Sequence, residues 1–292
     1  MESMMTAPVS ASARPGLRRL ISAHPLAAFV TLAYLSSWSW WIPFVLSGDT
    51  FKQGVGWPTQ MPGLAGPLLA AVIVTWAVDG GEGLRRLWRS MAAWRVGWWW
   101  LVVPVTLGAG AIGMLVSVDD IAKADLTTYS GIATGLGALA TIAYVFVFNG
   151  LGEEVGWRGF AVPHLLRTHS LAATSLIVAA MWAPWHLPMF FALESFEAFT
   201  VVEVIGWVIG LTAGSFLLTW LFRGSGGSVL LVAVWHTAFN FTSAATPASE
   251  GMVAAITSTL VMIAAVAIVV KERRSKTSGA LDHSLASWEE TP

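Results

Sequence analysis

The feature that most constrains this chain is a series of eight long apolar segments along its 292 residues. They lie at residues 25–46, 62–79, 98–118, 131–152, 171–192, 201–221, 227–243 and 252–270. Each approaches the ~20 apolar residues that a membrane-spanning helix needs, whereas the short alternating segments of a transmembrane barrel are absent from the sequence. Only 11% of the residues are charged, too few to cover a soluble globule. We therefore predict an all-α, polytopic membrane protein, with about eight transmembrane helices enclosing a polar intramembrane cavity.

The basic residues predict how these helices are oriented. With the N-terminus in the cytoplasm and eight crossings, 14 of the 16 lysines and arginines fall on cytoplasmic segments, and only Lys52 and Lys123 fall on the other side. Such a bias is typical of cytoplasmic loops. We expect a multi-pass protein of the cell membrane with both termini cytoplasmic. The chain then divides into a cytoplasmic tail at 1–24, a membrane domain at 25–270 and a second cytoplasmic tail at 271–292.

The cytoplasmic loop at residues 80–97 has a pattern of its own. Its large apolar residues recur at helical spacing, with arginines between them. This pattern fits an amphipathic helix that lies on the anionic inner leaflet, and it fits an ordinary basic loop equally well.

The composition excludes several classes of function. The formal net charge is −1 and no basic patch is large enough to grip a phosphate backbone, so we expect no nucleic-acid partner. The sequence contains no cysteine, which rules out disulfides, thiolate nucleophiles and cysteine-ligated zinc. We therefore look for catalytic or binding residues among the polar residues of the apolar segments. Charged groups inside a bilayer are energetically costly, so their presence indicates a functional role.

The fourth apolar segment ends in a run of ionisable residues, Glu153, Glu154 and Arg158. On a helix Glu154 and Arg158 are i,i+4 neighbours and can form an ion pair. Glu153 is rotated by about 100° from Glu154 and lacks that partner, so it stays available as a general base for water. The competing interpretation is a helix end that reaches the interface, where these charges are simply solvated.

Two further segments carry histidines. His186 follows Pro184 in the fifth segment, where proline bends the helix and an imidazole can exchange a proton near neutral pH. On the seventh segment, His236 and Asn240 are i,i+4 neighbours on one helix face, and two such donors can hold a developing oxyanion. Each pattern alone also fits a hydrogen-bonded packing residue or a polar contact between helices.

In this order the three patterns resemble the motifs of the CPBP family of intramembrane peptidases, the CaaX protease and bacteriocin-processing group that includes type II CaaX prenyl endopeptidases. The family's Glu-Glu-x-x-x-Arg motif matches at 153–158 and its His-x-x-x-Asn/Asp motif at 236–240. Its Phe-x-x-x-His motif matches at His186, with Trp182 in place of phenylalanine. That difference keeps an aromatic wall and bears mainly on the shape of the pocket. The resemblance covers about residues 130–245.

The resemblance implies hydrolysis of a peptide bond in a membrane-embedded or lipid-anchored protein or peptide, inside or at the edge of the lipid bilayer. The implied catalytic residues are those of the three motifs: Glu153, Glu154, Arg158, His186, His236 and Asn240. Of these, Glu153 and His186 would activate the water, and His236 and Asn240 would stabilise the oxyanion. The remaining Glu–Arg pair would fix the geometry of the first motif.

A metal is the open point of this interpretation. Two histidines and a glutamate could hold zinc and leave one coordination position open. However, Asn240 is a poor zinc ligand and a good oxyanion donor, and the resembled family includes members regarded as glutamate-dependent peptidases that need no metal. We therefore expect no cofactor and a glutamate-type protease, with zinc as the less favoured alternative.

Two other functions are compatible with the same apolar framework. A catalytically inactive immunity or scaffolding protein is expected to lack one of the six motif residues, and none is missing. A small proton-coupled transporter is expected to spread polar residues along several helices to form a path. Here they gather around one locus, which favours the protease.

Overall fold

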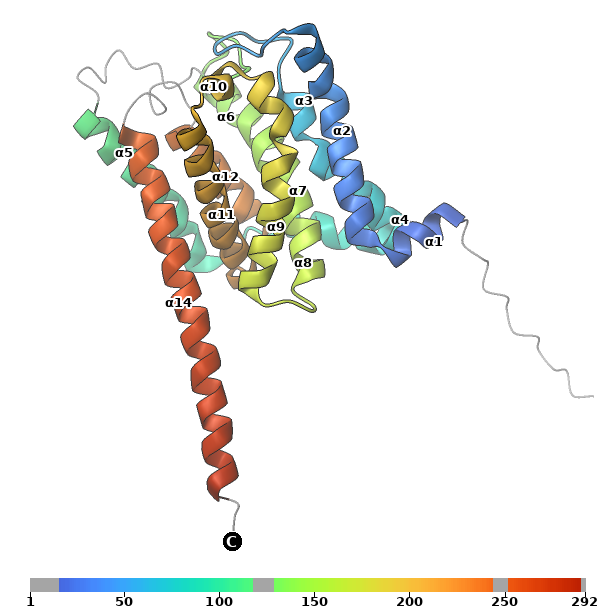
Figure 1. Ribbon diagram of the computed structural model, residues 1–292, viewed down its shortest axis with the longest axis vertical. Coiled ribbons are helices and arrows are strands. Elements are labelled where there is room, and N and C mark those ends of the chain that lie inside the picture. Colours follow the sequence, from blue (N-terminus) through green and yellow to red (C-terminus); the bar gives the residue numbers. More distant parts are fainter. Residues whose placement is uncertain (1–15, 118–128, 244–251, 290–292) are drawn as a thin grey trace, which may run out of the picture.

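A computed structural model describes residues 16–117, 129–243 and 252–289 (Figure 1). These three ranges are mostly helical and contain no β-strand, only two isolated bridges, between Phe51 and Leu193 and between Gln53 and Ser130. The predicted all-α class is confirmed.

The helices, in chain order, are α1 (Gly16–Ala23), α2 (Pro25–Ser47), α3 (Met61–Leu64), α4 (Gly66–Met91), η1 (Gly97–Leu101), α5 (Val102–Ser117), α6 (Ala138–Val145), η3 (Phe146–Leu151), α7 (Gly152–Gly156), η4 (Trp157–Ala161), α8 (Val162–Leu165), α9 (Leu171–Trp185), η5 (Leu187–Phe191), α10 (Glu194–Glu197), α11 (Val201–Gly224), α12 (Val229–Ser243) and α14 (Met252–Glu289).

Within the described ranges, five helical segments are long and apolar enough to cross a membrane: Pro25–Ser47, Met61–Met91, Ala138–Leu165, Val201–Gly224 and Val253–Arg274. The predicted spans at 98–118, 171–192 and 227–243 contain shorter helices, α5, α9 and α12. For α9 the cause is local, because Pro184 and Pro188 end the α-helix and a 3-10 segment, η5, follows. The protein is thus a polytopic helical membrane protein, with helices of unequal length.

Both ends of the described chain lie at the same end of the helix bundle (Figure 1). The helix α14 continues to Glu289, past the predicted limit of the membrane domain at 270, and α1 already begins at Gly16 within the predicted N-terminal tail.

The helix α4 is broken at Gly80, whose φ of 63° and ψ of −150° lie outside helical backbone. Glycine reaches a positive φ at little cost, so the chain changes direction here and a second helical piece continues to Met91. In this piece Leu87 is buried and Trp88 is 66% exposed. Part of the 80–97 loop is therefore a helix with one side packed on the bundle.

The core beside α2 is aromatic. Trp41 and Trp157 each pack against Trp185, with ring centroids 4.9 and 6.0 Å away, and all three side chains are fully buried. Phe29 meets the ring of Trp157 edge-on at 5.4 Å. Because these rings come from α2, η4 and α9, the elements that carry the first two motifs share one packed core.

Hydrogen bonds also hold α9 against α2. The Tyr34 hydroxyl donates to the Met181 carbonyl (2.7 Å), and Trp38 Nε1 donates to the Trp185 carbonyl (2.9 Å). In return, Trp185 Nε1 donates to Ser37 Oγ (2.8 Å). Polar side chains that bond across helices in apolar surroundings fix the position of one helix against the other, here at the end of α9 that carries the second motif.

Candidate active site

The first motif lies on a helical stretch that alternates between α- and π-helical turns. The π-helical segments η3 and η4 flank the short α7, which carries Glu153 and Glu154. Such π-helical turns are often found at functional sites. Glu153 is only 2% exposed, and Glu154 and Arg158 are fully buried. The alternative of a solvated helix end is therefore wrong, because these charges lie inside the bundle.

Two glycines let α7 approach α3 and α4 closely. A Cβ at Gly152 would lie 2.8 Å from the carbonyl oxygen of Leu64, and a Cβ at Gly156 would lie 2.5 Å from the Cβ of Pro67. Neither position accepts a side chain unless the backbone moves. The glycines thus set the depth at which Glu153 sits in the bundle.

Glu154 is the centre of a buried ionic network. Its Oε1 accepts one hydrogen bond from Arg158 Nη1 (2.8 Å) and another from His236 Nδ1 (2.8 Å). The i,i+4 ion pair expected from the sequence is present, and it also contacts the third motif. A carboxylate with two such donors is neutralised and held in one orientation.

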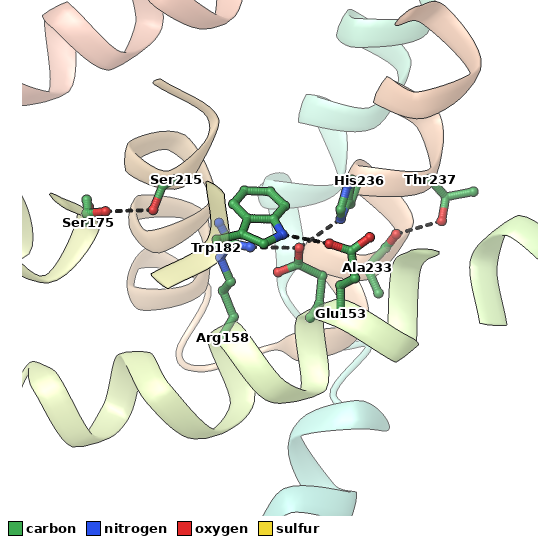
Figure 2. A network of polar contacts seen from close by, with 9 residues as sticks. Glu153, Arg158, Ser175, Trp182, Ser215, Ala233, His236 and Thr237 are labelled. Atoms are coloured by element: carbon green, nitrogen blue, oxygen red, sulfur yellow. Dashed lines mark hydrogen bonds and ion pairs between the residues drawn. The ribbon is translucent and has the colours of Figure 1, made fainter. Parts of the chain in front are cut away.

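Glu153 has different surroundings. Its Oε2 accepts a hydrogen bond of 2.7 Å from Trp182 Nε1, and Figure 2 shows the two side chains facing each other. Within the described ranges no arginine or lysine forms an ion pair with Glu153. The sequence indicated that this carboxylate lacks the arginine partner, but it did not indicate the indole donor, because Trp182 was interpreted as a wall of the pocket.

His186 follows directly after α9 and is 8% exposed. Its Nδ1 lies 2.9 Å from the carbonyl oxygen of Trp182, which can only accept a hydrogen bond, so Nδ1 carries the proton. In the neutral ring Nε2 is then an acceptor. The ring packs edge-on against Trp185 and Trp207, at centroid distances of 4.7 and 5.0 Å. Trp182 thus contacts both Glu153 and His186.

His236 and Asn240 lie on successive turns of α12. His236 Nδ1 faces Glu154, so Nε2 is the ring nitrogen that Glu154 does not engage. Asn240 is half-buried, and no hydrogen bond of the described residues joins it to the rest of the cluster. Five of the six predicted residues are thus linked through Glu154 and Trp182, and Asn240 lies one helical turn from them.

Sequence reasoning missed Tyr129, which precedes α6. Its side chain is 3% exposed, and its ring packs against Phe241 at 5.5 Å. Burial and, to a smaller degree, the negative charge of Glu153 raise the pKa of the Tyr129 phenol. The hydroxyl therefore stays protonated and can donate a hydrogen bond. A single tyrosine in a connecting segment has no spacing pattern that could have indicated it.

The carboxylates of the site face protein donors. Glu154 Oε1 bonds to a guanidinium and an imidazole, and Glu153 Oε2 bonds to an indole. Among the residues that the structure describes, no three His, Asp or Glu side chains are grouped in a way that could hold a metal ion. The two carboxylates are thus held by hydrogen bonds from neighbouring side chains.

The fold and the site together define a class, a polytopic helical membrane protein with paired glutamates, an arginine and two histidines buried between its helices. Residues 135–242 match the family described as Type II CAAX prenyl endopeptidase Rce1-like, and all six motif residues lie in this segment. The chain is also 20% identical over 227 residues to CAAX prenyl protease 2 of Methanococcus maripaludis, across 74% of this chain and 83% of that protein. Both similarities support the CPBP/CAAX protease family that the three motifs predicted.

Proposed function

We propose that this protein is an intramembrane endopeptidase that hydrolyses a peptide bond of a membrane-associated protein or peptide. The observation that carries the proposal is the contrast between two adjacent buried glutamates. Glu154 is held by Arg158 and His236, whereas Glu153 accepts a hydrogen bond from a neutral indole. A carboxylate that retains acceptor capacity, near an imidazole with a free Nε2, suits general-base catalysis on water.

In the proposed reaction Glu153 and Nε2 of His186 hold the attacking water. Glu153 takes a proton as the water oxygen bonds to the scissile carbonyl carbon, and the carbonyl π electrons move to oxygen. The same proton then passes to the amide nitrogen as the C–N bond breaks, which yields a carboxylic acid and an amine. The reaction consumes one water and is proposed to need no cofactor.

The proposed oxyanion donors are His236 and Asn240. Since His236 Nδ1 already faces Glu154, its Nε2 can donate only when both ring nitrogens carry protons, and the neighbouring carboxylate stabilises that charge. The amide of Asn240, one turn further along α12, supplies a neutral donor. Arg158 keeps Glu154 in place and thereby positions His236.

The proposed substrate is a membrane-embedded or lipid-anchored protein or peptide. The reason is the location of the motif residues, which lie among apolar helices, five of the six of them buried, so that a substrate held in the membrane lies nearest to them. The name of the archaeal relative supports a prenylated substrate as the first to test. The distribution of basic residues supports the cell membrane, with both termini cytoplasmic.

The test is cleavage of quenched fluorescent peptides by the purified full chain in lipid vesicles. One peptide ends in a CaaX sequence with a prenylated cysteine, and its partner lacks the prenyl group. We expect Glu153→Gln to lower kcat by about 10²–10⁴-fold, and the control Glu203→Gln, on the exposed start of α11, to retain full activity.

Three results would count against parts of this proposal. Cleavage by Glu153→Gln at the wild-type rate would remove the catalytic assignment. Loss of activity with a chelator would overturn the metal-free mechanism. Cleavage of neither peptide by the wild-type protein, in vesicles where it remains folded, would contradict the assigned substrate class.

A further inference from the structure

Trp182 lies at the centre of the site and contacts four of the predicted site residues. Its indole nitrogen donates to Glu153 (2.7 Å), and its own carbonyl accepts from His186 Nδ1 (2.9 Å). The guanidinium of Arg158 lies over its ring, 4.5 Å from the centroid, and the ring of His236 meets it edge-on at 5.7 Å. The side chain is 6% exposed. No other residue of the described ranges is shown to contact all four.

We propose that Trp182 is a positioning residue, whose indole N–H fixes the rotation of the Glu153 carboxylate so that Oε1 faces the attacking water. This inference rests on the proposed function. At this position the resembled family has phenylalanine, which has no hydrogen-bond donor.

The chemistry of the indole group supports this role. An indole N–H can donate but never accept, so Glu153 Oε2 must accept, and the other oxygen is left for the water. The terminal torsion of a glutamate is broad and roughly two-fold. A single short bond from a rigid ring therefore selects one orientation, and it does so without the neutralising charge that a lysine or arginine would bring.

Both the ring and the backbone of Trp182 are held in place. Arg158, already bonded to Glu154, covers one face of the indole. This cation–π contact is favourable, and it is stronger where water is excluded. The backbone of Trp182 is tied to His186 one turn later. The supporting Glu–Arg pair and the water-activating residues are thus connected through one residue, Trp182.

The test compares two replacements that differ in what they remove. Trp182→Phe removes the N–H together with part of the ring. Replacing Trp182 by β-(3-benzothienyl)alanine exchanges only the N–H for sulfur, keeps the bicyclic shape under Arg158, and serves also where Trp182→Phe does not fold. The matched control is Trp41→Phe, which removes an indole bond of 2.9 Å to the Gln60 carbonyl from another buried tryptophan.

We expect both replacements at residue 182 to lower kcat by about tenfold to a hundredfold and to leave KM within about twofold, since orientation of the base matters only in the transition state. Trp41→Phe should keep the wild-type kcat. A wild-type kcat for the benzothienyl variant would overturn the proposal, and so would an equal loss of kcat in Trp41→Phe. Failure of the proposed function itself would be seen separately, as wild-type cleavage that Glu153→Gln does not reduce.

Discussion

Two membrane-length segments of this protein are built in opposite ways. The helix α11, Val201–Gly224, is α-helical throughout, and the side chains of Val201 and Val202 are 75% and 77% exposed on its apolar surface. The segment Ala138–Leu165 passes from α6 through η3, α7 and η4 to α8, with an α- to π-helical change on each side of the paired glutamates.

The difference shows what a spanning helix gains from irregularity. A uniform apolar helix satisfies its backbone and needs only contact with lipid or neighbours. The irregular segment instead combines tight glycine contacts with ionisable side chains, and Glu153 and Glu154 are at most 2% exposed. The regular helix α11 is suited to crossing the membrane, whereas the irregular segment Ala138–Leu165 is suited to holding buried ionisable side chains.

The largest effect on stability is expected from breaking the buried ion pair of the irregular segment. Arg158→Met should lower the free energy of unfolding by about 3–5 kcal/mol, because it leaves Glu154 charged and short of one donor. The control is Arg223→Met in α11, which removes the ion pair of a half-exposed arginine with Glu272 and should cost less than about 1 kcal/mol.

Denaturant unfolding of both variants in detergent micelles measures this difference. The double variant Glu154→Gln with Arg158→Met should recover part of the lost stability, because no uncompensated charge remains. Equal losses at residues 158 and 223 would contradict the view that burial separates the two segments.

A smaller loss is expected where α7 lies against α3. In Gly152→Ala the added Cβ would meet the Leu64 carbonyl oxygen at 2.8 Å, so the helix has to shift, at about 1–3 kcal/mol. The shift displaces Glu153, and kcat should fall with stability. Gly210→Ala in α11, where a Cβ meets nothing within 4 Å, should leave kcat unchanged and should not lower stability, because alanine is the better helix former. Thermal unfolding and peptide cleavage, measured on the same preparations, check the pair of variants.

The sequence predicted the regular segment better than the irregular one. Apolar length alone indicated α11, because a spanning helix needs little else. The motif residues and the pairing of Glu154 with Arg158 were also predictable, since i,i+4 spacing is a local property of a helix. The π-helical turns of η3 and η4 were not predicted, because no residue pattern in this stretch distinguishes them from α-helical turns.

The sequence also did not predict the contacts between segments that are distant along the chain. The bond from Trp182 to Glu153 joins residues 29 positions apart, and the bond from His236 to Glu154 joins residues 82 apart. His236 was expected to act with Asn240 alone, and its bond to Glu154 follows only from the packing of α12 against α7. Tyr129 was missed for the same reason, because its burial against Phe241 is a property of the fold.

The smallest effect is expected from the cap at the start of α11, which has no part in the candidate site. Thr200 caps this helix, with its hydroxyl accepting from the Glu203 amide (3.4 Å) and the Glu203 carboxylate accepting from the Thr200 amide (2.7 Å). Thr200→Ala should lower Tm by about 2 °C and leave kcat unchanged. Thr212→Ala, whose exposed hydroxyl bonds only to the Val208 carbonyl within the helix, should change neither. Loss of activity in Thr200→Ala would contradict the separation of the two segments, because it would mean that the cap of the regular helix controls the position of the glutamates in the irregular one.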